Sequence, residues 1–220
     1  MSLQVFRFGR EDMDASTEKM MTASRHIAAQ VTGWEEGDTY IKHPDRDIKI
    51  IMYGEGTTIH CGVELNGRQA ERQYTWAFTN GGDNGAARFF ITTNSDNGIA
   101  VAWGNATDLA HCMTGVAQNT LGDFIGFLCY PNFTIVQENP SQSSAPSYTR
   151  AGTLPESTAY CVASLAEYPD LYSESTIRGL YQVLTIPKNT SISSFELEGH
   201  LFVCLYFQNA SSPIVVMRAD

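Results

Sequence analysis

Two histidine–cysteine pairs, His60-Cys61 and His111-Cys112, are of the residue types that bind zinc. Neighbouring residues of a strand point to opposite faces, so neither pair can chelate one ion there. His200 and Cys204 share strand parity, but roughly 13 Å of extended chain separates them. Because none of the usual zinc spacings occurs, we expect buried cysteines beside exposed or hydrogen-bonded histidines, and no metal site. A zinc site assembled from several distant segments is the alternative.

Paired carboxylates are the second candidate for chemistry. Glu35-Glu36, and Asp45 with Asp47, lie in polar connecting segments beside Gly or Pro, which predicts solvated loop residues. The Asp-Asn-Gly sequences at 83–85 and 96–98 offer hard oxygen ligands for calcium. They lack the acidic density and the terminal Glu of an EF-hand loop, so tight turns are the preferred interpretation.

The usual catalytic and phosphate-binding motifs do not occur. There is no Gly-x-x-x-x-Gly-Lys, no Gly-x-Gly-x-x-Gly, no Gly-x-Ser-x-Gly elbow and no His-Glu-x-x-His. We therefore expect no catalytic residue, no cofactor and no small-molecule substrate. The formal net charge is −10, and the 14 Lys and Arg residues form no cluster. A nucleic-acid binder needs a cationic track for phosphates, so direct nucleic-acid binding is disfavoured.

Five cysteines stand at positions 61, 112, 129, 161 and 204, far apart and mostly within apolar stretches. We expect them to be reduced, buried thiols rather than disulfides. No stretch has the pattern of a signal peptide, and no apolar run reaches the length that spans a bilayer. These features predict a chain that is made and folded in a cytoplasm, with no membrane partner.

One amphipathic helix is expected over residues 15–31. Asp14 can cap it, Glu18 favours its first turn, and Gly33 is a natural stop. A helix of this length needs an apolar surface to lie on, and the strands that follow are the obvious candidate. The residues on its expected buried face recur at three- and four-residue spacing: Met13, Thr17, Met20, Ser24, Ile27 and Val31.

From Asp47 onward apolar and polar residues alternate, which is typical of strands with one buried face. We expect an antiparallel meander of about five strands over residues 47–104, with Gly- and Asn-rich turns between them. Tyr74, Trp76 and Trp103 lie on these strands, where aromatic residues are more often core than sugar-binding. Further strands are expected at Phe124–Tyr130, Leu180–Ile186, Phe195–Leu197, Leu201–Phe207 and Pro213–Met217.

The fold class predicted is mainly β, an antiparallel β-sandwich-like fold with one N-terminal amphipathic helix. An α+β fold is the alternative. Residues 1–12 are expected to form an N-terminal arm and residues 13–220 a single β-rich domain. A long loop over residues 137–158, rich in Ser and Pro, is expected to be a contact site.

The order of these segments carries a resemblance to a known group of proteins. Its stretches are Thr32-Gly33-Trp34, Asp47–Gly56, Phe89–Ala102, Leu201–Asn209 and Val215–Asp220. The pattern resembles a group of uncharacterised virion structural proteins from tailed bacteriophages, in which a helix ends at Thr-Gly-Trp and the chain closes on an apolar strand with Gln-Asn. The likeness covers most of the chain and is weakest over residues 105–170. It implies an assembly part of the tail, neck or baseplate without catalysis.

The resemblance and the composition together predict a structural subunit of the virion, assembled in the host bacterial cytoplasm. Its partners would be copies of itself and other virion structural proteins. A carbohydrate- or receptor-binding module of a tail appendage is the alternative, and an enzyme of unseen type is the third hypothesis. Aromatic residues exposed together on one sheet face favour the binding module, whereas a cleft with two facing carboxylates favours the enzyme.

Overall fold

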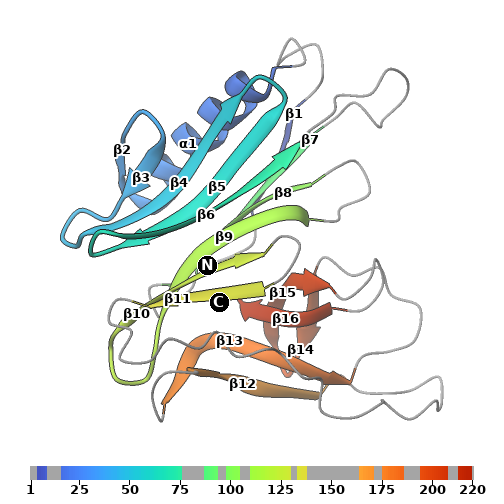
Figure 1. The fold of residues 1–220 in the computed structure, drawn as a ribbon. Helices are drawn as coiled ribbons and strands as arrows, with labels where there is room; N and C mark the ends of the chain where they lie inside the picture. The colour runs from blue at the N-terminus through green and yellow to red at the C-terminus, as the bar shows by residue number, and fades with distance from the viewer. Residues whose placement is uncertain are drawn as a thin grey trace.

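The computed structural model describes residues 4–8, 16–75, 87–93, 98–104, 110–129, 133–137, 164–170, 175–185, 194–207 and 213–219. These residues form three antiparallel sheets and one α-helix. The sheets are stacked in layers, and one of them lies between the other two (Figure 1). The predicted mainly β fold with one N-terminal helix is confirmed.

The first layer, which we call the helix-bearing sheet, has the strand order β2-β3-β4-β5-β6. Its strands pair in sequence order because tight turns join them. Between β5 and β6, Asn66 and Gly67 adopt the positive φ values that such a turn requires, 47° and 76°. The strands are β2 (Glu35–Glu36), β3 (Tyr40–Lys42), β4 (Ile48–Glu55), β5 (Thr58–Leu65) and β6 (Arg68–Thr75).

The second layer, the middle sheet, has the order β1-β7-β8-β9-β10-β11 and is apolar on both faces. Trp103 and the residues on the same face of β8 pack toward the helix-bearing sheet, while Ala100 and Ala102 pack toward the third sheet. All of β8 is therefore buried. The strands are β1 (Gln4–Phe8), β7 (Ala87–Thr93), β8 (Ile99–Gly104), β9 (Ala110–Gln118), β10 (Phe124–Cys129) and β11 (Phe133–Gln137).

The third layer, the C-terminal sheet, has the order β12-β13-β16-β15-β14. Its bulky residues Ile177, Leu180 and Met217 pack against the alanine-rich face of the middle sheet. Large side chains on one layer thus fill the space left by small ones on the other. The strands are β12 (Ser164–Asp170), β13 (Ser175–Thr185), β14 (Ser194–Leu197), β15 (His200–Phe207) and β16 (Pro213–Arg218).

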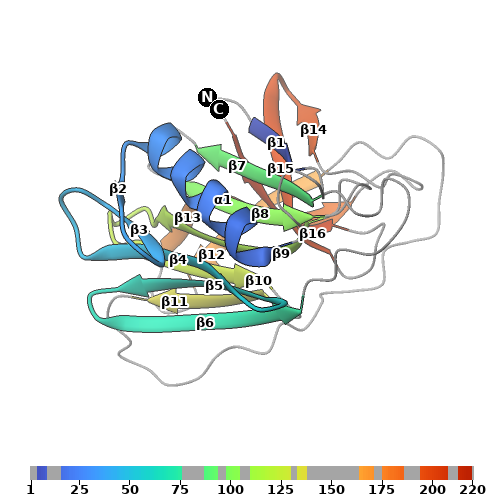
Figure 2. The same ribbon diagram turned by 90° about the horizontal axis from the view of Figure 1, so that it is seen from above.

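The helix α1 (Thr17–Thr32) packs on β4 of the helix-bearing sheet, on the side that also contacts β7 of the middle sheet (Figure 2). Gly54 permits this close approach, because a Cβ at that position would lie 2.5 Å from the carbonyl carbon of Thr17. The side chain of Ser16 caps the helix by accepting from the Lys19 amide. The expected cap, Asp14, lies outside the described residues. The predicted stop at Gly33 is confirmed, since its φ is 71° and its amide donates to the Ala29 carbonyl.

The sequence predictions for the strands are confirmed in part. Strands β4 to β8 provide the five expected over residues 47–104, but they form no single meander, because β6 and β7 belong to different sheets. The predicted strand at Phe124–Tyr130 corresponds to β10, and those of the C-terminal region correspond to β13 to β16.

The expected N-terminal arm is structured in part. Residues 4–8 of the segment predicted as an arm form β1, the edge strand of the middle sheet. Of the expected loop over residues 137–158, Gln137 ends β11 and the remainder lies outside the described residues.

Candidate functional site

The outer face of the helix-bearing sheet carries a connected group of polar and aromatic side chains. Alternation along β5 turns Cys61 and Val63 into the core, so His60 and Glu64 lie on the opposite, outer face. The strand register places side chains of β3, β4 and β6 beside them. We call this group the outer-face cluster: Tyr40, Lys49, Tyr53, His60, Glu64, Gln69 and Glu71.

His60 is the centre of the cluster. Its Nδ1 lies 2.7 Å from Glu71 Oε1, and its ring stacks on Tyr53 with 4.2 Å between the centroids and 12° between the planes. Tyr53 donates to the same Glu71 oxygen at 3.3 Å, and Gln69 donates to the other one at 2.9 Å. Three strands thus meet at one carboxylate.

Burial and the nearby carboxylate keep the Tyr53 phenol protonated. Burial, followed by the negative charge of Glu71, raises the pKa of Tyr53 above its ordinary value. At the other end of the cluster Lys49 donates to Glu64 at 2.7 Å and lies over the Tyr40 ring at 5.3 Å. The hydrogen bond to Glu64 raises the pKa of Lys49, so this ammonium stays charged.

Among the described residues, the contacts of His60 are those of a cross-strand pair. A His–carboxylate dyad activates a hydroxyl or thiol placed at the second ring nitrogen. The described contact of His60 Nε2 is instead the carboxylate of Glu55, at 3.9 Å. The dyad therefore joins strands, as cross-strand pairs do elsewhere in sheets.

A second histidine lies where the helix-bearing sheet meets the middle sheet. His43 packs edge-on against Trp34 at 5.2 Å and against Phe124 of β10 at 5.9 Å. Its Nδ1 accepts from the Asp45 amide at 3.1 Å, and Arg46 lies over the Phe124 ring. Burial lowers the pKa of His43; the Asp45 carboxylate opposes this effect and Arg46 adds to it. The imidazole is held as a neutral acceptor.

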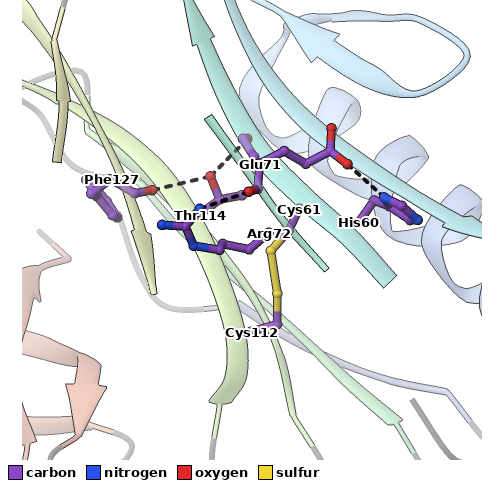
Figure 3. The surroundings of a disulfide bond; sticks show 8 residues. His60, Cys61, Glu71, Arg72, Cys112, Thr114 and Phe127 are labelled. Atoms are coloured by element: carbon purple, nitrogen blue, oxygen red, sulfur yellow. Dashed lines mark hydrogen bonds and ion pairs between the residues drawn. A yellow bond between two sulfur atoms is a disulfide. The ribbon is translucent and has the colours of Figure 1, made fainter. Parts of the chain in front are cut away.

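A disulfide between Cys61 of β5 and Cys112 of β9 crosses the same interface (Figure 3). The expectation of five reduced cysteines is therefore wrong for this pair. Both cysteines point inward from sheets that face each other, and they lie 51 residues apart, so their spacing in the sequence did not reveal the pairing. Thr114, on the same face as Cys112, donates to the carbonyls of Gly62 and Phe127.

The other residues considered for chemistry are dispersed. Glu36 forms contacts with Arg25 at 3.6 Å and with His26 at 3.0 Å, whereas Asp47 lies 3.8 Å from Lys42. Trp103 is buried and Tyr74 packs against the core, as predicted. The Asp-Asn-Gly sequences at 83–85 and the first two residues of 96–98 lie outside the described residues, as does Trp76.

Within the described part of the chain, no group of three or more His, Cys, Asp or Glu side chains is placed to hold a metal ion. Among the same residues, no helix is long and apolar enough to cross a membrane.

Comparison with known proteins finds no match to any protein-family model, curated protein or solved structure.

We predict that His43 makes stability depend on pH. The folded state lowers the pKa of His43, so once the pH falls below about 6.5 the unfolded chain binds more protons than the folded one. The free energy of unfolding therefore decreases on acidification. The His43→Gln variant should lose less stability between neutral and mildly acidic pH than the wild type, as measured by urea unfolding. At alkaline pH, where residue 43 is uncharged in both proteins, their free energies of unfolding should depend on pH in the same way. If the free energies of unfolding of the two proteins fell equally with pH in acid, a neutral His43 in the folded state would be contradicted.

We also predict that Cys61 and Cys112 resist alkylation in denaturant without a reductant. Reduction should lower the free energy of unfolding by about 4 kcal/mol, because the bond closes a long loop in the unfolded chain (sequence separation 51). Peptide mapping by mass spectrometry and urea unfolding with and without reductant measure the two effects. Alkylation of both residues in the unreduced protein would show that the bond is absent.

Proposed function

We propose that this chain is a structural subunit of a tailed-phage particle, acting without catalysis through contacts with copies of itself and with other virion proteins. The observation that carries the proposal is that the described layers are tied to one another at both interfaces. The disulfide and the hydrogen bond from Thr114 to the Gly62 carbonyl join the helix-bearing and middle sheets. Such a stack suits a component that transmits force without changing shape.

The second interface is tied by the turn between β9 and β10. Asn119 organises this turn by accepting from the amides of Leu121 and Asp123. The amide of Thr120 then donates to the Thr176 carbonyl of β13 at 2.9 Å. The turn thereby fixes the C-terminal sheet against the middle sheet.

The disulfide and the charge are compatible with a particle that leaves the cell. Disulfides are rare in a reducing cytoplasm but persist in oxidising surroundings, including virion surfaces. A chain assembled in the bacterial cytoplasm and released by lysis meets dissolved oxygen, which can accept the two electrons and two protons that the Cys61 and Cys112 thiols lose when the disulfide forms. A net charge of −10 suits contact with basic surfaces of partner proteins. We propose that the subunit lies in the tail, neck or baseplate of the particle.

The alternative of a carbohydrate-binding module finds less support in the outer-face cluster. Stacking on a sugar needs an aromatic ring with an open face. One face of Tyr53 is covered by His60, and the Lys49 ammonium lies over the ring of Tyr40. Each ring is also half-buried. We therefore favour a role in assembly over sugar binding.

The proposal predicts that the chain is a stoichiometric part of purified particles. A phage that encodes it, with the gene deleted, should yield incomplete particles, and supply of the wild-type chain in trans should restore infectivity. Quantitative mass spectrometry of gradient-purified particles measures copy number, and electron microscopy shows which part is missing. Normal infectious particles that lack the chain would contradict the proposal. Turnover of a glycan, peptide or nucleotide by the purified chain would contradict its non-catalytic character.

A further inference from the structure

The two cysteines of the disulfide stand in unlike surroundings. Cys61 lies on β5, next to the edge strand β6, and its register partners are Met52 of β4 and Arg72 of β6. Cys112 lies on β9, between β8 and β10 of the middle sheet, and its register partner on β8 is the fully buried Trp103. One cysteine therefore has a cation beside it at the border of the interface, whereas the other has an indole beside it in the interior.

Arg72 points to the core side of its strand. Alternation along β6 places Arg72 on the same face as Cys61, while Glu71 lies on the outer face with His60. Side chains directly opposite each other on one face stand about 5 Å apart at Cβ, and Figure 3 draws Arg72 with the disulfide. Arg72 is half-buried, and its Nη1 donates to the Glu71 carbonyl at 3.1 Å. A guanidinium in this position favours the thiolate form of the neighbouring cysteine.

The interface admits some reagents more readily than others. Cys61 and Cys112 are 0% and 1% exposed, among closely packed apolar side chains such as Val63, which rests on the backbone of Gly126. A thiol reductant attacks as a thiolate in line with the S–S bond, so it must bring its charge out of water into this interface. A small, uncharged oxidant carries no such cost. The surroundings therefore favour oxidation of the pair in the folded chain over its reduction by thiols.

We propose that Cys61 and Cys112 form a redox latch that closes within the folded chain. Cys61 is the reactive cysteine, Cys112 is the resolving cysteine, and Arg72 is a positioning residue that favours the Cys61 thiolate. The apolar interface then shields the closed bond from thiol reductants. This inference goes beyond the proposed virion role, since it is a property of the isolated chain.

Hydrogen peroxide, which forms when oxygen takes up two electrons and two protons, is the oxidant of this step. The Cys61 thiolate attacks one peroxide oxygen, the O–O bond breaks and hydroxide leaves, which gives a sulfenic acid at Cys61. The Cys112 thiol then attacks that sulfur, so the S–S bond forms and the S–O bond breaks. The hydroxyl group leaves with the thiol proton as water. Two electrons have passed from the two sulfurs to the peroxide.

Peptide mapping of single-cysteine variants tests the two roles. Chains refolded under reductant are freed of it, treated with hydrogen peroxide while folded, then denatured, alkylated and digested. In the wild type we expect the Cys61–Cys112 bond. In Cys112→Ala, Cys61 should carry added oxygen, because no resolving thiol is present, whereas in Cys61→Ala, Cys112 should remain an alkylated thiol. Oxidation of Cys112 in Cys61→Ala as fast as that of Cys61 in Cys112→Ala would overturn the assignment of roles.

Variants of Arg72 test the activation without changing either cysteine. Bond formation by the folded, reduced chain should be about tenfold slower in Arg72→Gln, because the cation beside the thiolate is lost. The Arg72→Lys variant keeps the charge and should restore most of the rate. The matched control is Arg68→Gln, on the same strand and face but opposite Leu65, and it should react like the wild type. An unchanged rate in Arg72→Gln, or equal slowing in Arg72→Lys, would overturn the role of Arg72.

Reduction of the closed bond tests the shield. Dithiothreitol should reduce Cys61–Cys112 on the order of a hundredfold more slowly in native buffer than in urea that unfolds the chain, because the thiolate needs an open interface. Equally fast reduction in native buffer would overturn the shield. A folded, reduced chain that forms no bond with peroxide until it is unfolded would overturn the latch itself. Neither result bears on the proposed function, which is tested separately by the presence of the chain in purified particles.

Discussion

The burial of the middle sheet on both faces is the constraint on which the rest of the structure depends. A strand such as β8, with every residue buried, cannot be stable unless an apolar layer covers each side. The helix-bearing sheet and α1 provide one cover, and the C-terminal sheet provides the other. The three layers are therefore parts of one cooperative unit, because removing either cover would expose one face of β8.

Small residues, a disulfide and a hydrogen bond set how closely these layers approach one another. A Cβ at Gly126 would lie 2.7 Å from a methyl carbon of Val63, so the absence of a side chain at Gly126 lets Val63 of β5 pack directly on the backbone of β10. The Cys61–Cys112 bond and the hydrogen bond from Thr114 to the Gly62 carbonyl lie in the same interface. With the interior apolar and tightly packed, the polar side chains of the helix-bearing sheet collect on its outer face. There Glu71 gathers His60, Tyr53 and Gln69 into one network.

Local sequence patterns predicted the helix and several strands, but not the sheet to which each strand belongs. Spacing predicted α1, its stop at Gly33, and strands such as β5 and β10, because periodicity and turn chemistry act over a few residues. The division of β6 and β7 between two sheets depends on contacts across the fold, which no local pattern encodes. The Cys61–Cys112 pair was missed for the same reason.

Part of the outer-face cluster was within reach of sequence reasoning. A tight turn at Gly56 sets the register of β4 and β5, and that register pairs Tyr53 with His60 and Met52 with Cys61. The Asn66-Gly67 turn similarly sets β6 against β5 and brings Glu71 beside Gly62. Reading these registers would have placed His60 near a carboxylate. The contacts of His43 with Trp34 and Phe124 could not be derived in this way, since they cross between sheets.

Native-state hydrogen–deuterium exchange, resolved by strand, tests most directly whether the middle sheet organises the fold. If the two covers and the middle sheet form one unit, the amides of β8 and β10 exchange only through global unfolding, at a rate that follows the overall free energy of unfolding. Amides at the outer edges, in β6 and β14, exchange faster through local opening. Exchange of β8 as fast as that of β6, under conditions in which the protein remains folded, would contradict the account.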